Sequence, residues 1–213
     1  MKIIIHADDF GYDRDTCNAT IDAFERGLIK SASIMPTAPA ANKAIEYAKQ
    51  HPQYSYGIHL TFVDGFKAAC PDGIRKLTDN SSCFLNSRIV RKRAFLFSLS
   101  SNDILKEILA QIEIVESAGI KISHLDSHGH LHKLPPFLLA LKKLRKYHPD
   151  LKVRRVQNIH LHHHSHRFIS PFYYLNRLFD NIIQRRFITT NLFYMPANQL
   201  DTKWGGGNTG NHW

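Results

Sequence analysis

The stretch Ile120–His132, which reads I-K-I-S-H-L-D-S-H-G-H-L-H, decides how the whole chain is interpreted. Chemically active residues occupy every second position in its second half: His124, Asp126, His128, His130 and His132. Side chains two apart in a strand share one face, so the early members of this row are expected to project together. Gly129 permits a sharp turn, and Pro135 suits the start of a following helix. A strand ending in imidazoles and a carboxylate indicates the wall of an active site; a polar strand edge with chance histidines is the alternative.

The composition limits which kinds of protein the chain can be. The 213 residues suffice for one domain with a full core, and 43% hydrophobic and 22% charged residues are ordinary for a soluble globular protein. The net charge of +10 suggests an anionic partner, such as nucleic acid, a membrane surface or an acidic glycan. Because the basic residues are scattered, with short clusters only at 88–93, 142–146 and 152–155, we favour a solvated basic surface over a nucleic-acid site. Three cysteines without a C-x-x-C pair predict neither a disulfide framework nor a thiolate zinc site.

Targeting signals are not evident in the sequence. The N-terminus does not resemble a signal peptide, and no apolar run approaches the roughly 20 residues of a membrane span. We therefore expect a reduced, cytoplasmic protein without a membrane span.

Alternating apolar and amphipathic segments predict an α/β fold with parallel strands. We expect strands at about 3–5, 32–35, 56–62, 120–128, 151–156 and 192–195. We expect helices at about 17–28, 40–50, 101–118 (capped by Ser101 or Asn102), 135–147 and 171–187. About six β-α units fall short of the eight in a complete (β/α) barrel. The pattern therefore predicts a distorted or incomplete (β/α) barrel.

The domain organisation is expected to be simple. We predict one barrel-like domain over residues 1–195 and a flexible or atypical tail over 196–213. The segment 64–98 has turn signals but no dominant period, which is more typical of a lid or binding loop than of packing. The histidine tract 160–166 is interpreted as a solvated loop, in preference to an opportunistic metal site.

Candidate ligands and bases stand where the predicted strands end. Asp8 and Asp9 follow the first strand, His59 lies near the end of the third, and Asp126 and His128 end the fourth. In parallel α/β folds these ends meet at one rim. One carboxylate and two imidazoles would make a three-ligand set for a divalent ion. Neighbouring strand residues point to opposite sides, so one aspartate could ligate while the other deprotonates water; a helix N-cap is the alternative for this pair.

Three motifs together carry a resemblance. His6–Gly11 (HADDFG), Gly57–Leu60 (GIHL) and His124–His132 (HLDSHGHLH) resemble the YdjC-like carbohydrate deacetylase family. That family includes chitooligosaccharide deacetylases and deacetylases of N-acetylglucosaminyl lipids. The resemblance covers roughly residues 1 to 156. It implies a distorted (β/α) barrel, removal of an N-acetyl group from an amino sugar, one divalent metal ion and a homodimer. The ion would be Mg²⁺ by resemblance, with Zn²⁺ or another transition metal left open.

Carried over by position, the resemblance assigns roles to residues. Asp9, His59 and His128 would hold the metal, and Asp8 would be the catalytic base. Either His130 or His132 would be the general acid. Asp126 would orient a ligand histidine, and His124 joins it as a supporting or substrate-contacting residue. Arg154 would hold a substrate oxygen or developing negative charge, a surface arginine being the alternative.

One departure stands out. Family members usually run longer and carry a further His-Pro-containing motif on a late strand, and this motif is not found here. The segment from about Pro196 onward does not resemble the family.

Two other functions are compatible with these residues. Asp/His metal sites on α/β folds also hydrolyse phosphoesters. A catalytically impaired relative that binds sugar or nucleic acid is the second alternative.

Overall fold

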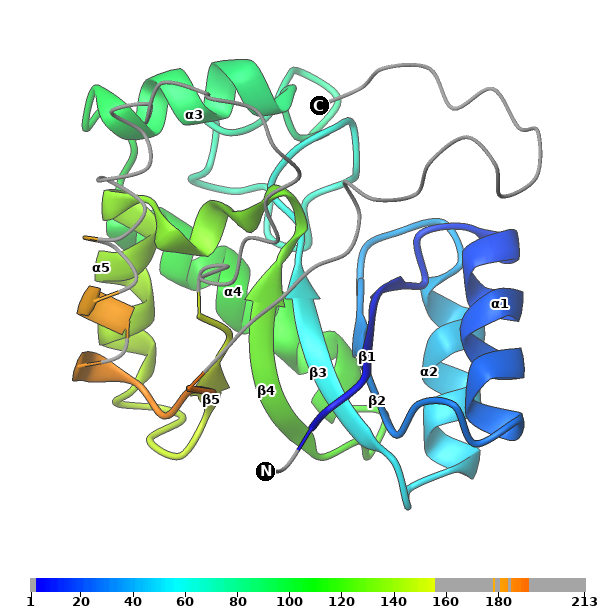
Figure 1. The fold of residues 1–213 in the computed structure, drawn as a ribbon. Helices are drawn as coiled ribbons and strands as arrows, with labels where there is room; N and C mark the ends of the chain where they lie inside the picture. Colours follow the sequence, from blue (N-terminus) through cyan, green and yellow to red (C-terminus); the bar gives the residue numbers. More distant parts are fainter. Residues whose placement is uncertain (1–2, 156–177, 179–180, 184, 192–213) are drawn as a thin grey trace, which may run out of the picture.

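Five parallel strands form a single sheet in the computed structural model, which describes residues 3–155, 178, 181–183 and 185–191 (Figure 1). The strands are β1 (His6–Phe10), β2 (Ser31–Ile34), β3 (Ser55–Leu60), β4 (Ile122–Ser127) and β5 (Lys152–Val153). Their order in the sheet is β1-β2-β3-β4-β5, the same as in the chain. Right-handed crossovers that all step in one direction leave every connecting helix on the same face of the sheet. This is how part of a (β/α) barrel is built, and the predicted α/β class with parallel strands is confirmed.

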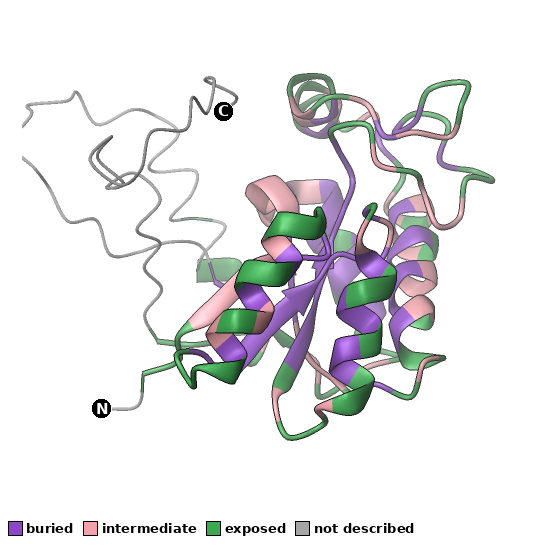
Figure 2. Cartoon of the chain, turned by 90° about the vertical axis from the view of Figure 1, so that its right-hand side faces the viewer, coloured by how far each residue is buried: buried purple, intermediate pink, exposed green. Residues whose placement is uncertain are grey.

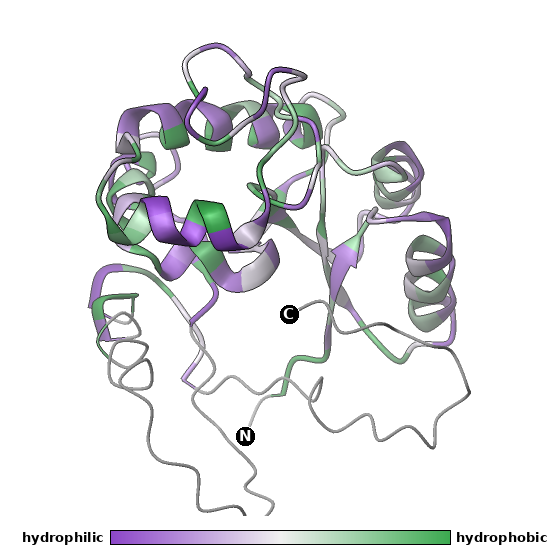
Figure 3. Ribbon diagram, turned by 90° about the horizontal axis from the view of Figure 1, so that it is seen from above, coloured by the Kyte–Doolittle hydropathy of each residue, from purple (hydrophilic) through white to green (hydrophobic). Residues whose placement is uncertain are grey.

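The helices are α1 (Arg14–Glu25), α2 (Ala41–Gln50), α3 (Ser87–Phe95), α4 (Ser101–Glu116) and α5 (Pro135–Leu144), with a 3-10 turn η1 (His128–Lys133) after β4. The helices α1, α2, α4 and α5 cover the outer face of the curved sheet, whereas α3 lies beyond the carboxyl ends of the strands (Figure 1). Viewed from the side, buried residues fill the strands and the inward helix faces, while exposed residues lie outward (Figure 2). Seen from above, each helix carries both polar and apolar residues (Figure 3).

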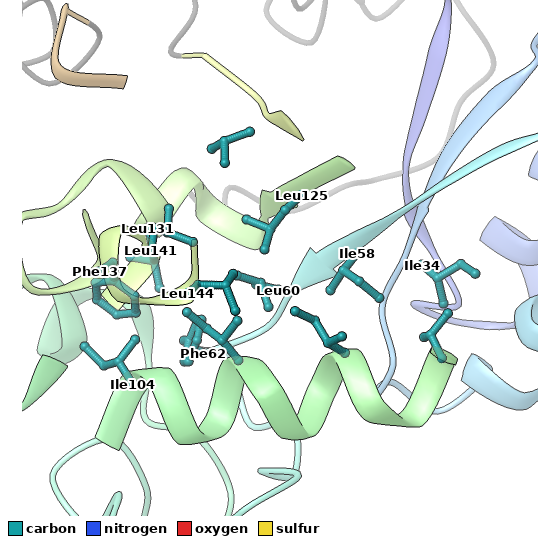
Figure 4. Packing of buried hydrophobic residues seen from close by; sticks show 14 of the residues in the cluster. Ile34, Ile58, Leu60, Phe62, Ile104, Leu125, Leu131, Phe137, Leu141 and Leu144 are labelled. Carbon is teal, nitrogen blue, oxygen red and sulfur yellow. The ribbon is translucent and has the colours of Figure 1, made fainter. Parts of the chain in front are cut away.

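The central core lies between β3–β4 and α4. Ile58 and Leu60 of β3, with Phe62 just beyond it, project toward α4 (Figure 4). The facing stripe of α4 is fully buried: Ile104, Ile108, Ile112 and Val115. Each such side chain contributes about 1.5–3 kcal/mol through its removal from water. Because Ile58 and Leu60 point to this core, the intervening His59 must point to the opposite, inner face of the sheet.

The expected strand over Ile3–Ile5 is wrong. Ile3, Ile4 and Ile5 are 73%, 69% and 62% exposed, and β1 is instead the polar segment that follows them. The reason lies in the register of the sheet, because the ladder with β2 begins at the pair His6–Ser31.

Other element boundaries shift slightly. The α4 cap is Ser100, whose hydroxyl accepts a hydrogen bond from the Asp103 amide at 3.2 Å. The predicted helix at 135–147 ends at Leu144, and β5 is shorter than predicted. The expectations for residues 160–166, 192–195 and 196–213, and most of the helix at 171–187, lie outside the described residues. No helix among the described residues is long and apolar enough to cross a membrane.

The segment 64–98 is more structured than expected. It contains two antiparallel bridges, Lys67–Cys83 and Thr78–Phe84, and the helix α3. The sequence does not predict α3, because only Val90 and Ala94 on it are buried, which is too few for a clear helical period.

A buried polar pair on α4 holds the first part of this segment. The Glu107 carboxylate accepts hydrogen bonds from the backbone amides of Ala69 (2.9 Å) and Cys70 (2.7 Å). Gln111 donates to Glu107 at 2.7 Å, and its side chain pairs with both the amide and the carbonyl of Thr61. Burial raises the pKa of Glu107, although these hydrogen bonds oppose the shift. The segment is therefore attached to the core by side chains that are themselves buried.

Replacing Glu107 with Gln is expected to lower the free energy of unfolding by about 2–4 kcal/mol. The amide group would turn an N–H toward one of the backbone donors and leave that donor buried without an acceptor. Denaturant unfolding measures the change. The matched control is Glu113→Gln, at an exposed position of the same helix, which should change stability by less than about 0.5 kcal/mol. Equal effects of the two substitutions would contradict the anchoring role.

Candidate metal centre

A bulge in β1 sets the position of the paired aspartates. Ala7 pairs with Ala32 and Phe10 with Ile34, so β1 fits one more residue than β2 into the same interval. The backbone of Asp9, in the left-handed region at φ 57°, accommodates this additional residue. Asp8 and Asp9 consequently both reach the rim of the sheet. The expectation that they point to opposite sides is wrong, because it assumed a regular strand.

Three predicted metal ligands meet at this rim. One oxygen of Asp9, Oδ1, lies 3.0 Å from His59 Nε2 and 2.8 Å from His128 Nδ1. One ligand atom from each of the three residues lies within 4.8 Å of the others. The side chain of His59 is 4% exposed, whereas that of Asp9 is 34% exposed. The group is thus supported from inside the protein and open toward solvent on one side.

Asp126 orients His59 within this group. Its Oδ1 lies 2.6 Å from His59 Nδ1, and its Oδ2 accepts a hydrogen bond of 3.0 Å from the Ser33 hydroxyl. A proton on Nδ1 facing the carboxylate leaves the lone pair of Nε2 directed at Asp9 and His128. Carboxylate–histidine pairs of this kind orient metal-ligating imidazoles in proteins. The donor set therefore fits a divalent ion.

The charged residues around this ligand set strongly change one another's pKa values. Burial disfavours ionised Asp126, but Arg154 and His59 outweigh it and hold the pKa of Asp126 well below its ordinary value. Burial also opposes the ionisation of Asp9, yet hydrogen bonds from His128 and His59 lower the pKa of Asp9. For His59, burial is again overcome, and the two carboxylates raise its pKa to about 10. Asp9 and Asp126 are thus held in their ionised forms, and a cation bound here would take the place of the proton on His59 Nε2.

Arg154 joins two of the carboxylates. Its Nη1 donates to Asp8 Oδ2 at 2.7 Å, while its Nη2 contacts both Asp8 Oδ1 and Asp126 Oδ2. Its side chain is 8% exposed, so the residue lies inside the site and not on the surface. Burial acts against the charged form, but Asp126 and Asp8 raise the pKa of Arg154 further. Asp8 is therefore held in one orientation.

The two trailing histidines differ in their surroundings. His132 is buried, with Nδ1 2.7 Å from the Ser127 hydroxyl and Nε2 3.1 Å from the Arg154 carbonyl oxygen. Burial lowers its pKa to about 3. Burial, followed by the charge of Lys133, lowers the pKa of His130 to about 4. Both ring nitrogens of His132 are occupied, whereas His130 remains the better placed of the two to exchange a proton.

His124 lies deeper on the inner face. Its Nδ1 is 2.8 Å from the Ser123 hydroxyl, and its Nε2 is buried without a hydrogen-bond partner among the described residues. Burial lowers its pKa to about 4. The ring lies directly over Gly57, where an added Cβ would come within 2.3 Å of Nε2.

Gly57→Ala is accordingly expected to lower the free energy of unfolding by about 1–3 kcal/mol, because the new methyl group displaces the imidazole. Thermal or denaturant unfolding measures it. The control is a double-mutant cycle with His124→Ala, which removes the obstructing ring. If the Gly57→Ala penalty is the same in the His124→Ala background, the clash is not its cause.

Several residues of the site were missed by sequence reasoning. His6 lies 3.5 Å from Asp8 and packs edge-on against His124, with ring centroids 4.8 Å apart. It stands two residues before Asp8, so the strand period could have found it. The rings of Tyr12 and Phe66 flank His128 at centroid distances of 5.9 and 6.2 Å, and no sequence pattern marks them.

Two further groups of possible ligands lie beside the first, and one of them shares His59 with it. They are His6 with His124 and Asp126, and Asp8 with His59 and Asp126. Both use Asp126, whose oxygens already face His59 and Arg154. The set of Asp9, His59 and His128 is therefore the best candidate for a metal.

Comparison with known proteins identifies the family of this chain. The family model described as YdjC-like protein matches residues 2–209. The chain belongs to the YdjC-like family. The match continues beyond Pro196, so the expectation that this last segment does not resemble the family is wrong for most of its length.

The YdjC-like chain has curated relatives. A carbohydrate deacetylase of Listeria monocytogenes is 32% identical over 161 residues, covering 75% of this chain and 62% of the relative. One of Vibrio cholerae is 35% identical over 155 residues, covering 71% and 58%. The chain thus spans about 60% of the length of the curated relatives that it matches.

A solved structure supports the YdjC-like fold. It is described as a proposed cellobiose-phosphate cleavage protein of Enterococcus faecalis, and it shares 26% sequence identity with this chain. The TM-score is 0.71, with 94% of this chain and 71% of the other covered.

Proposed function

We propose that the chain is a metal-dependent hydrolase that removes the N-acetyl group from an N-acetylated amino sugar, either a chitooligosaccharide or an N-acetylglucosaminyl glycolipid. The convergence of Asp9, His59 and His128, with Asp126 behind His59, carries the proposal. The names of the curated relatives, carbohydrate deacetylases, supply the reaction class.

Asp9, His59 and His128 would hold one divalent ion. Magnesium is expected from the family resemblance, while two imidazoles and a carboxylate also suit Zn²⁺ or another transition metal. Such an ion supplies Lewis acidity, which polarises an amide carbonyl and makes water a nucleophile near neutral pH.

Asp8 is proposed as the general base. Its carboxylate stands beside the ligand set, and Arg154 fixes its orientation. An ionised carboxylate within reach of the attacking water can accept its proton. Arg154 would act through Asp8 and Asp126, because its guanidinium is engaged with both.

His130 is proposed as the group that delivers a proton to the departing amine. His132 would instead support the turn η1, because its nitrogens contact Ser127 and the Arg154 carbonyl. A variant pair separates the two roles: His130→Gln should slow turnover without loss of stability, and His132→Gln should chiefly destabilise the fold.

Acetate release is the experiment that tests this function. The substrates are di-N-acetylchitobiose and an N-acetylglucosaminyl lipid, each with and without a chelator. We expect release that the chelator abolishes and that added divalent metal restores. Phosphate release from a nitrophenyl phosphate without acetate release would favour a phosphoesterase. Sugar or nucleic-acid binding without any hydrolysis would favour a catalytically impaired relative.

His128→Ala is expected to weaken metal binding by at least about 100-fold and to abolish acetate release, because it removes one of three protein ligands. Titration calorimetry measures the affinity. The matched control is His148→Ala, which alters a histidine near Glu116, after the C-terminal end of α5, and should leave both properties unchanged. Retained deacetylation in His128→Ala would refute the ligand assignment. Cytoplasmic location and a homodimer stay predictions.

A further inference from the structure

The far end of α3 presents an exposed apolar group. Phe95, Leu96 and Phe97 are 38%, 66% and 72% exposed, and Ile89 on the same helix is 37% exposed. The group is held in a defined turn, because the Phe97 amide donates to the Ala94 carbonyl at 3.2 Å and the Ser98 amide to the Arg93 carbonyl at 3.0 Å. Large apolar side chains gathered in this way on a surface indicate a contact with a partner.

The surroundings of this group are basic. The segment 87–99 carries four basic residues, Arg88, Arg91, Lys92 and Arg93, and no acidic residue. Arg88 and Lys92 are exposed. Lys76 is exposed beside the same turn, with its Nζ 3.0 Å from the Ser98 carbonyl oxygen. We call the exposed side chains of Arg88, Ile89, Lys92, Phe95, Leu96 and Phe97 the basic-apolar tip.

The tip is connected to the core and to the turn η1 by other residues of α3. Val90 and Ala94, on the other side of α3, are buried in the core. The Arg91 guanidinium contacts the Gly129 carbonyl oxygen, in the turn that carries His128 and His130. In Figure 1, α3 lies beyond the carboxyl ends of the strands, at the same end of the molecule as the candidate metal centre.

We propose that the basic-apolar tip docks the protein on an anionic lipid bilayer. Aromatic and aliphatic side chains enter the interface between headgroups and acyl chains, and flanking lysine and arginine residues are attracted to anionic headgroups. A second copy of the chain fits less well, because a symmetric contact through the tip would bring like charges together. The proposal does not depend on the hydrolytic function, since docking needs neither metal nor substrate.

Vesicle sedimentation tests the proposal. The full chain is mixed with phosphatidylcholine vesicles, with and without phosphatidylglycerol, at low and high salt. We expect binding only to vesicles with phosphatidylglycerol, weakened by salt. The double variant Leu96→Ser/Phe97→Ser should lower the partition coefficient by at least about tenfold. The pair Arg88→Gln/Lys92→Gln should lower it by roughly tenfold or more.

Matched controls separate the tip from the general positive charge. Leu28→Ser removes a leucine that is 54% exposed in the turn after α1. Lys142→Gln/Lys146→Gln removes two exposed charges, one on α5 and one just after it. Both should bind vesicles like the unaltered chain. Absence of vesicle binding, or equal losses in the controls, would overturn the proposal. So would tip variants that change self-association in sedimentation velocity but not vesicle binding.

Discussion

Asp8→Asn is expected to lower kcat for deacetylation by about 1,000-fold while leaving metal affinity within threefold of the unaltered chain. The substitution keeps the shape of the side chain but removes its basicity. It touches none of the atoms that converge between Asp9, His59 and His128. The predicted outcome is therefore a protein that binds metal and does not turn over.

The neighbouring carboxylate supplies the matched control. Asp9→Asn should lose metal affinity first, because Asp9 Oδ1 is the atom that faces both imidazoles. Calorimetric titration with Mg²⁺ and Zn²⁺, together with acetate release at saturating metal, distinguishes the two variants. Equal loss of metal affinity in both would make Asp8 a ligand and refute its proposed role as base.

Asp126→Asn is expected to weaken metal binding by about 10–100-fold and to lower the free energy of unfolding by about 3–5 kcal/mol. Asp126 is fully buried and pairs with both His59 and Arg154. An amide cannot neutralise the guanidinium, so part of the charge of Arg154 would be left buried without compensation. His59 would also lose the acceptor that sets the direction of its Nε2.

Ser33→Ala tests whether the charge or the hydrogen bonding of Asp126 matters. It removes the 3.0 Å hydrogen bond to Asp126 Oδ2 but keeps both the carboxylate and Arg154. Denaturant unfolding and metal titration should show a loss of about 1–2 kcal/mol in stability and a change of less than tenfold in affinity. If Asp126→Asn has no larger effect than Ser33→Ala, electrostatic support of the site is not the role of this residue.

Much of the fold could be predicted because the residues of its core alternate regularly. The period of two around Ile58 and Leu60 places His59 on the opposite face, and parallel strands bring their carboxyl ends together. These two rules are sufficient to predict that Asp9, His59 and His128, from three distant segments, lie close together. Both rules use only local periodicity and the general geometry of a parallel sheet.

The remaining features depend on interactions that no local pattern encodes. The bulge at Asp9 follows from how β1 fits against β2, not from its own sequence. The pairing of Arg154 with Asp8 joins residues 146 positions apart. Ile3–Ile5 were misassigned because their apolar character outweighed the polar residues that actually join the ladder.

The sequential strand order has a consequence for how the site assembles during synthesis. Each strand can dock on a neighbour that has already emerged, so the sheet can grow from β1 toward β5 as the chain is made. Asp8 arrives with the first strand, Asp126 with the fourth, and Arg154 only after β5. Until β5 docks, the nascent rim holds carboxylates without their guanidinium partner. Docking of β5 should therefore be the step that brings Arg154 to the carboxylates and stabilises the rim. A ribosome-stalled chain that ends before Arg154 should be measurably less resistant to proteolysis than one that extends past it.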